Sequence, residues 1–144
     1  MLSTSKAKEA DARRLGAAEF ALTTERSTFK RLARRFDLIL DTISAPHDYN
    51  AYLGLLEVDG TMVLLGVPPQ PTPVAAFALI GGRRSLAGSL IGGIAETQEL
   101  LDHCAAHGIT SDVEVIPVSQ VNLAYDRMLK NDVRYRFVLD LATL

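Results

Sequence analysis

The chain has 144 residues, of which 48% are hydrophobic and 22% charged, and this composition suits a globular domain with a substantial core. Its formal net charge of -2 gives no reason to expect nucleic acid or an anionic membrane as a partner. A single cysteine excludes a disulfide framework and favours a reducing, cytoplasmic setting, and no apolar stretch is long enough to span a bilayer.

Strand and helix patterns alternate along the chain. In order, we predict a helix at residues 6–15, a strand at 20–22, a helix from 23 or 24 to 34, a strand at 36–40, a helix at 48–56, a strand at 61–65, a short helix at 74–80, a strand at 85–91, a helix at 95–107, a strand at 113–118, a helix from 119 and a strand at 136–141. Alternation of this kind is typical of a doubly wound parallel sheet in an α/β fold.

Caps and apolar stripes complete this prediction. Ser5, Thr23 or Thr24, and Ser119 are the expected N-caps, and glycines 16 and 108 should end their helices. Two helices should bury an apolar stripe, formed by Phe29, Leu32 and Ala33 in one and by Val121, Ala124, Tyr125, Met128 and Leu129 in the other.

The stretch from Phe36 to Gly66 organises the remainder of the chain. Its strands, 36–40 and 61–65, carry apolar residues on both faces, so helices should cover both faces of a parallel sheet. Ligands of such sheets bind beyond the carboxyl ends of the strands. The turns at 41–45 and 66–68 are therefore the expected location of the chemistry.

Hydroxyl and amine side chains gather near the N-terminus, at Ser3, Thr4, Ser5, Lys6 and Lys8. Between a strand end and a helix start, such a cluster favours an anion. In dinucleotide-binding folds a carboxylate here selects NAD, whereas a basic site suits the extra phosphate of NADP, and no carboxylate precedes Glu9. An ordinary capped and solvated N-terminus is the alternative reading.

Three other patterns are weaker. Asp41 ends a strand as in bacterial receiver domains, but the acidic pair and Lys-Pro of that family do not occur, and a bond to the following turn is the simpler expectation. His103 and His107 lie one helical turn apart, whereas zinc needs three or four ligands. The glycines at 88–93 could admit a flat ligand, although they do not form a G-x-G-x-x-G fingerprint.

In this order and spacing, the motifs resemble the C-terminal part of zinc-dependent medium-chain alcohol dehydrogenases of the cinnamyl alcohol dehydrogenase type. The segments that carry the resemblance are Ser3–Lys8, Leu15–Ala17, Phe36–Ala45, Gly60–Gly66, Gly88–Gly93 and Asp132–Val138. The resemblance implies an NADP(H)-dependent enzyme that interconverts primary alcohols and aldehydes with a catalytic zinc in a separate domain. It implies a Rossmann-like sheet incomplete at its N-terminus, with the first strand and most of the second missing. Residues 1–112 would then form a partial dinucleotide-binding domain, and 113–144 a segment returning toward the catalytic domain.

The same resemblance implies a set of cofactor contacts. It places Thr4, Ser5 and Lys8, with Ser3 and Lys6 nearby, at the 2′-phosphate; Thr42, Ser44 and Ala45 along the adenosine; Val67 and Pro68 at the nicotinamide ribose; Ser89, Ile91 and Gly92 at the carboxamide; and Arg134 near the pyrophosphate. It also implies a homodimer joined through the edge strand Ser85–Ile91, since a long apolar edge is otherwise open to solvent.

The family's zinc ligands, proton relay and glycine-rich phosphate turn have no counterpart here, so we expect the isolated chain to lack dehydrogenase activity. The alternative, from another class, is a non-catalytic nucleotide-binding or subunit-association module. A missing central strand would leave ladder groups on 36–40 unpaired, at about 1–3 kcal/mol for each buried group. We therefore expect marginal stability, rearrangement of residues 1–35, or dependence on a partner that restores the strand.

Overall fold

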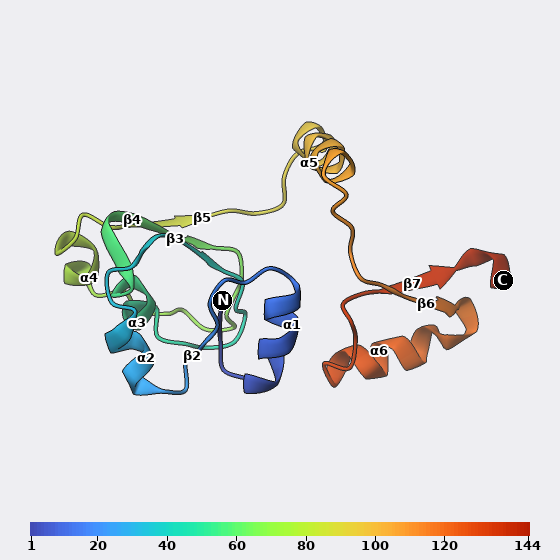
Figure 1. The fold of residues 1–144 in the computed structure, drawn as a ribbon, viewed down its shortest axis with the longest axis horizontal. Coiled ribbons are helices and arrows are strands. Elements are labelled where there is room, and N and C mark those ends of the chain that lie inside the picture. Colours follow the sequence, from blue (N-terminus) through green and yellow to red (C-terminus); the bar gives the residue numbers. More distant parts are fainter. The chain divides into compact units, whose positions relative to one another are not determined.

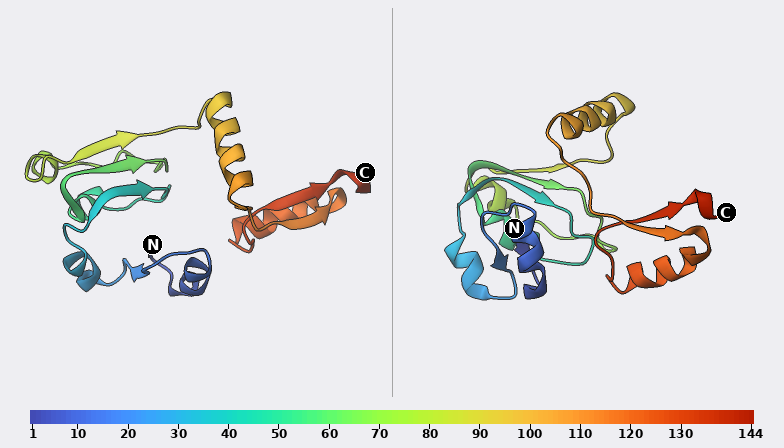
Figure 2. Two further views of the ribbon diagram at one scale, coloured as in Figure 1. Left: turned by 45° about the horizontal axis from the view of Figure 1, so that its top comes forward. Right: turned by 45° about the vertical axis from the view of Figure 1, so that its right-hand side comes forward.

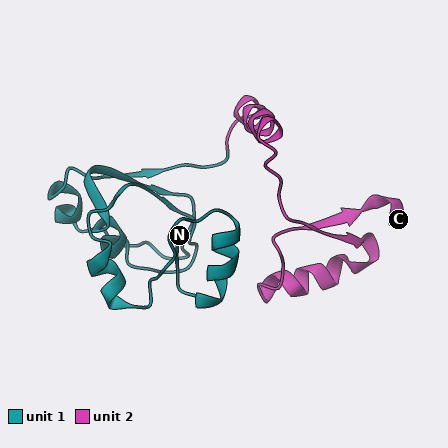
Figure 3. Cartoon of the chain, in the orientation of Figure 1, with its two compact units in different colours: residues 1–91 teal, residues 92–144 magenta.

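The computed structural model describes all 144 residues, and every strand pairing in it is parallel. The strands form three sheets with the orders β1-β2, β3-β4-β5 and β6-β7 (Figure 1). The chain divides into two compact units, residues 1–91 and 92–144 (Figure 3). The predicted α/β class with parallel strands is confirmed, whereas the predicted domain boundary at residue 112 stays a prediction.

Unit 1 contains the elements that position the candidate site. They are β1 (Leu2–Ser3), a 3₁₀ turn (Lys6–Lys8), α1 (Glu9–Arg14), β2 (Ala21–Leu22), α2 (Arg26–Arg31), β3 (Phe36–Asp41), α3 (Tyr49–Leu53), β4 (Leu56–Leu64), α4 (Ala76–Ile80) and β5 (Ser85–Gly88). Figure 2 shows β3, β4 and β5 side by side. In the pairing of β3 with β4, Leu40 lies opposite Val63, so the two organising strands are parallel neighbours as predicted.

Local chemistry explains the strand-helix-strand unit. Asp48 is the N-cap of α3, and its carboxylate accepts a 2.9 Å hydrogen bond from the Asn50 backbone N–H.

After α1, Gly16 has a φ of +94°, a left-handed conformation that a glycine adopts without strain. The predicted helix-ending role of this glycine is confirmed.

The core of unit 1 lies between the helices and one face of the larger sheet. Its fully buried large side chains are Leu32, Leu53, Leu55, Leu56 and Met62. The edge-to-face contact of Phe29 with Tyr52, at 5.3 Å between ring centroids, joins α2 to α3.

The prediction that helices cover both faces of β3 is wrong for one face. Ile39 and Asp41 point into the buried side, but Leu38 and Leu40 are 55% and 61% exposed. The core cluster that the helices of unit 1 help to form includes Ile39 and leaves out both Leu38 and Leu40. An apolar strand pattern predicts that both faces of a strand are apolar, but it does not show that a helix is present to cover each face.

Several predicted boundaries are also corrected. Ser5 makes no side-chain cap, because the chain enters a 3₁₀ turn at Lys6 before α1 begins. Glu25, not Thr23 or Thr24, occupies the N-cap position of α2, and Ala33 is exposed. The predicted strand 85–91 ends at Gly88, so Ser89 to Ile91 lie outside the sheet. The strand predicted at 61–65 begins earlier, at Leu56.

Unit 2 has little core of its own. It contains α5 (Ile94–Ala106), β6 (Glu114–Pro117), a 3₁₀ turn (Val118–Gln120), α6 (Val121–Leu129), β7 (Phe137–Asp140) and a final 3₁₀ turn (Leu141–Thr143). Ser119 lies within the first of these turns and makes no cap. Of the stripe predicted to be buried on α6, only Ala124 is buried, whereas Tyr125 and Leu129 are 61% and 84% exposed.

Candidate nucleotide-binding edge

The carboxyl ends of β3, β4 and β5 meet at one edge of the larger sheet. The Asp41 carbonyl oxygen, at the end of β3, accepts hydrogen bonds from the Leu65 and Gly66 N–H groups, at 2.8 and 3.0 Å. The Leu64 carbonyl accepts from the Ser89 N–H at 3.1 Å. The turns after all three strands therefore share the edge where parallel α/β sheets bind ligands.

The turns after β3 and β4 are packed against each other. A Cβ added to Gly66 would lie 2.3 Å from the Ile43 carbonyl oxygen, so no side chain fits there. Beside this contact, Ser44 Oγ accepts a 3.4 Å hydrogen bond from the Val67 N–H. The structure thus brings together the predicted residues Thr42, Ser44 and Ala45 of one turn with Val67 and Pro68 of the other.

A half-buried histidine and a buried aspartate hold the turn after β3. His47 Nε2 lies 2.8 Å from Asp41 Oδ2, and His47 Nδ1 lies 2.8 Å from the Ala45 carbonyl oxygen. The two side chains are only 11% and 5% exposed. The other Asp41 oxygen, Oδ1, accepts from the Ile43 N–H at 3.0 Å, which confirms the predicted bond to the following turn.

Sequence reasoning missed His47 as part of this edge. The histidines that attract attention in the sequence are His103 and His107, whose rings stack with centroids 4.1 Å apart. The available signal was a histidine six positions after a strand-ending aspartate, within a turn already singled out. The spacing does not by itself indicate a contact, because the two side chains meet only where the turn folds back toward the end of β3.

The N-terminal hydroxyl and amine cluster follows the carboxyl end of the parallel strand β1. Ser3 Oγ accepts a 3.2 Å hydrogen bond from the Ser5 N–H, and the Ser5 carbonyl accepts from the Lys8 N–H at 3.2 Å. Thr4, Lys6 and Lys8 are exposed to solvent. The cluster is therefore a compact turn that presents hydroxyls and amines, the donor set that suits a phosphate.

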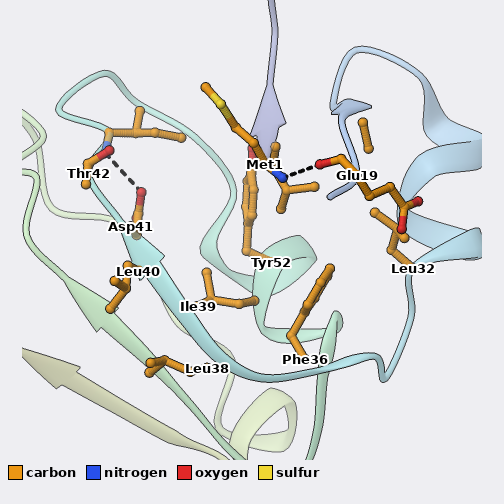
Figure 4. A pocket seen from close by; sticks show the side chains of 13 residues that line it. Met1, Glu19, Leu32, Phe36, Leu38, Ile39, Leu40, Asp41, Thr42 and Tyr52 are labelled. Atoms are coloured by element: carbon orange, nitrogen blue, oxygen red, sulfur yellow. Dashed lines mark hydrogen bonds between the residues drawn. The ribbon is translucent and has the colours of Figure 1, made fainter. Parts of the chain in front are cut away.

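A pocket of about 340 Å³ separates β1 from β3 (Figure 4). Its walls are largely apolar and include Leu38, Ile39, Leu40 and Tyr52. Glu19 lies at the opposite wall, where hydrogen bonding from the Arg31 guanidinium lowers the pKa of its carboxyl group, assisted by the charge of Arg35. The pocket reaches Asp41, Thr42 and Ile43, so it opens at the same edge as the turns.

The remaining predicted contacts lie after β5 and in unit 2. Ser89 and Ile91 lie beyond the end of β5 and are exposed, and Ser89 Oγ donates to the Leu90 carbonyl at 3.3 Å. Gly92 and Arg134 belong to unit 2, where the Arg134 N–H donates to Glu114 Oε1 at 3.1 Å. Their cofactor roles stay predictions.

The family-implied zinc does not fit the residues present. No group of three or more histidine, cysteine, aspartate or glutamate side chains is placed to hold a metal ion. This chain therefore supplies no step of a zinc mechanism.

No helix of the chain is both long and apolar enough to cross a bilayer.

The parallel strands and the shared edge define an α/β protein with a Rossmann-like arrangement of strands. The model of the zinc-binding dehydrogenase family matches residues 1–106, and the chain belongs to this family, as the sequence motifs predicted. The NADP-dependent alcohol dehydrogenase C of Mycobacterium bovis is 54% identical over 144 residues, which are 100% of this chain and 42% of that protein.

Two solved structures agree with this assignment. A cinnamyl alcohol dehydrogenase from Sorghum bicolor matches with a TM-score of 0.91 and 41% identity, over 98% of this chain and 40% of that one. The cinnamyl alcohol dehydrogenase of Helicobacter pylori, solved in complex with NADP(H), matches with a TM-score of 0.82 and 30% identity over the same shares. The chain thus spans about two fifths of the length of its relatives.

Proposed function

We propose that this chain forms the NADP(H)-binding part of a zinc-dependent dehydrogenase that interconverts primary alcohols and aldehydes by hydride transfer. The observation that carries the proposal is the shared edge, where Ser44 and Val67 are joined across two strand ends beside the exposed Thr42. Its support from relatives is the 54% identity to a protein named as an NADP-dependent alcohol dehydrogenase. The cytoplasm, as a reducing compartment, suits its single cysteine.

The cofactor would lie along the edge in an extended form. Thr42, Ser44 and Ala45 would flank the adenosine, and Val67 and Pro68 the nicotinamide ribose. The turn after β1, with Thr4, Ser5 and Lys8, would receive the 2′-phosphate. Bound NADPH would supply the hydride, while the chain's own residues would bind and orient it.

Zinc and substrate contacts belong to the rest of the proposed enzyme. A hydride acceptor must be polarised beside the nicotinamide, and this chain offers one wall of such a site. We therefore propose that the chain alone does not turn over alcohols or aldehydes. Zinc-dependent turnover by the purified 144-residue protein would contradict this part of the proposal.

Titration of the 144-residue protein with NADPH and with NADH tests the cofactor assignment. A charge-assisted hydrogen bond to the 2′-phosphate should make NADPH bind roughly tenfold more tightly or better. Lys8→Ala should remove most of that preference and leave NADH binding unchanged. Lys30→Ala, at an exposed lysine of α2, is the matched control and should alter neither. Tighter binding of NADH would overturn the assignment.

We also propose that two copies join through β5. This strand pairs only with β4 and forms one edge of its sheet. Pairing of two such edges would satisfy their free backbone groups. Analytical ultracentrifugation should show a dimer that Leu86→Pro, within the edge strand, dissociates; a monomer at all concentrations would contradict the proposal.

A further inference from the structure

The turn between β3 and α3 closes on a single side chain. His47 reaches back to Asp41 at the end of β3 and to the Ala45 carbonyl in the middle of the turn, at 2.8 Å in each case. The residues enclosed by this bridge are 42–46, which include the proposed adenosine contacts Thr42, Ser44 and Ala45. The shape of that segment therefore depends on a residue that does not itself belong to the predicted contact set.

Packing fixes the ring that makes the bridge. The imidazole contacts the rings of Tyr49 and Tyr52 edge-on, with centroids 4.9 and 5.4 Å away. Both tyrosines are buried, at 5% and 8% exposure, within the helix that covers β3. Because the ring is clamped by α3, the two hydrogen bonds anchor the turn to the core rather than to solvent.

The bridge also joins the turn after β4. Asp41 uses its carbonyl oxygen to accept from Leu65 and Gly66, while its carboxylate accepts from the Ile43 N–H. Gly66 in turn packs directly on Ile43. A change at His47 would therefore be felt at Ser44 and at its hydrogen bond with the Val67 N–H.

The hydrogen-bond partners of the two ring nitrogens of His47 limit which of them carries a hydrogen. The Ala45 carbonyl can only accept, so Nδ1 carries a hydrogen. Nε2 then either donates to an ionised Asp41 or accepts from a protonated one.

We propose that His47 is a positioning residue for the nucleotide: its bridge from Asp41 to Ala45 holds residues 42–46 in their binding shape. The inference rests on the proposed NADP(H)-binding function and deepens it. His47 does not touch the cofactor in this scheme. It acts through Ser44 and Ala45.

Two substitutions distinguish the effect of the hydrogen bonds of His47 from the effect of its ring contacts with Tyr49 and Tyr52. His47→Phe keeps a ring against Tyr49 and Tyr52 but removes both hydrogen-bonding nitrogens, and we expect the dissociation constant for NADPH to rise about tenfold, or about 1.4 kcal/mol. His47→Gln retains an amide donor and should recover part of the affinity. Thermal unfolding measured in parallel distinguishes a positioning role from a structural one, since a structural role would lower the melting temperature and leave the affinity of the folded protein unchanged.

Asp41→Asn tests the bridge from its other end. An asparagine can donate from its amide nitrogen to Nε2 of a neutral imidazole and still accept from the Ile43 N–H through its oxygen. This variant should therefore keep the bridge, and its affinity for NADPH should stay close to that of the wild-type protein. A loss of affinity as large as that of His47→Phe would contradict the role of the bridge.

The outcomes separate the two proposals. If the wild-type protein binds no NADPH, the proposed function fails and this inference fails with it. If the wild-type protein binds and His47→Phe binds equally well, only the inference is overturned. Faster hydrogen exchange at Ile43 and Val67 in His47→Phe, with unchanged exchange at Met62, would support the positioning role without any ligand.

Discussion

The two compact units use the same pairing geometry but differ in what covers their strands. In unit 1, β3 and β4 pack one face against helices, and side chains such as Leu53 and Met62 are fully buried. In unit 2, β6 and β7 are equally parallel, yet Ala124 is the one residue that is buried. Parallel backbone pairing thus does not produce a core until a helix supplies the opposing apolar layer.

The largest expected effect is at the centre of the unit 1 core. Leu53→Ala removes a side chain with 0% exposure and should lower the free energy of unfolding by about 2–5 kcal/mol. Its matched control in unit 2 is Leu129→Ala, at a side chain 84% exposed, where a change within about 0.5 kcal/mol is expected. Urea unfolding of both variants measures the contrast, and similar losses would contradict the difference between the units.

A smaller effect is expected where the two turns of unit 1 touch. Gly66→Ala would bring a methyl group to 2.3 Å from the Ile43 carbonyl oxygen, and overpacking of this kind costs about 1–3 kcal/mol. The control is Gly88→Ala, since a Cβ at Gly88 meets nothing within 4 Å. Thermal unfolding should separate the two variants. An unaffected Gly66→Ala protein would show that the turns do not pack as described.

The smallest effect is expected from the ion pairs that hold unit 2 together. Hydrogen bonding from Arg127 lowers the pKa of both Glu114 and Asp132, at 2.8 and 2.9 Å. Because the folded pKa values are depressed, the stabilisation is present above the ordinary carboxyl pKa of about 4 and is lost as pH falls through the lowered values. Exposure of these groups keeps the contribution small.

Hydrogen exchange in the β6–β7 ladder measures this contribution at Val115 and Val138. Arg127→Met should speed exchange at neutral pH and flatten its dependence on acidification. The guanidinium also lies 4.7 Å from the centroid of the Phe137 ring, and that contact is lost in the same variant. Arg26→Met, at an exposed arginine of unit 1, should leave the profile of unit 2 unchanged.

Much of unit 1 could be predicted because its signals are local. The apolar run 36–40, the cap at Asp48 and the stop at Gly66 each act within a few residues, and the structure places β3, α3 and β4 where these signals indicate. The helix ends at Gly16 and Gly108 follow from a positive φ, +94° and +63°, at residues without a Cβ.

What could not be predicted depends on distant partners. The exposure of Leu38 and Leu40 reflects which layers are present, and a strand pattern carries no information about them. The failed caps at Ser5 and Ser119 arise from 3₁₀ turns that precede the helices. Such turns share their residue preferences with helix starts, so the two are hard to separate by composition.

For the candidate site, sequence motifs located the turns but not what holds them. The motifs name both Ser44 and Val67, although nothing in their separate motifs indicates the hydrogen bond between them. No motif names His47, because its partners, Asp41 and Ala45, come close to it only after the chain turns back. Residues that organise a loop are less visible in a sequence than residues that a family motif names.

The unpaired side of β3 bears on how this protein behaves at high concentration. β3 ends its sheet on one side, and next to its free backbone groups it displays Leu38 and Leu40. Unprotected apolar edges of this kind template intermolecular β-pairing and, in time, precipitation. We expect colloidal stability, more than thermal stability, to limit the handling of the purified chain.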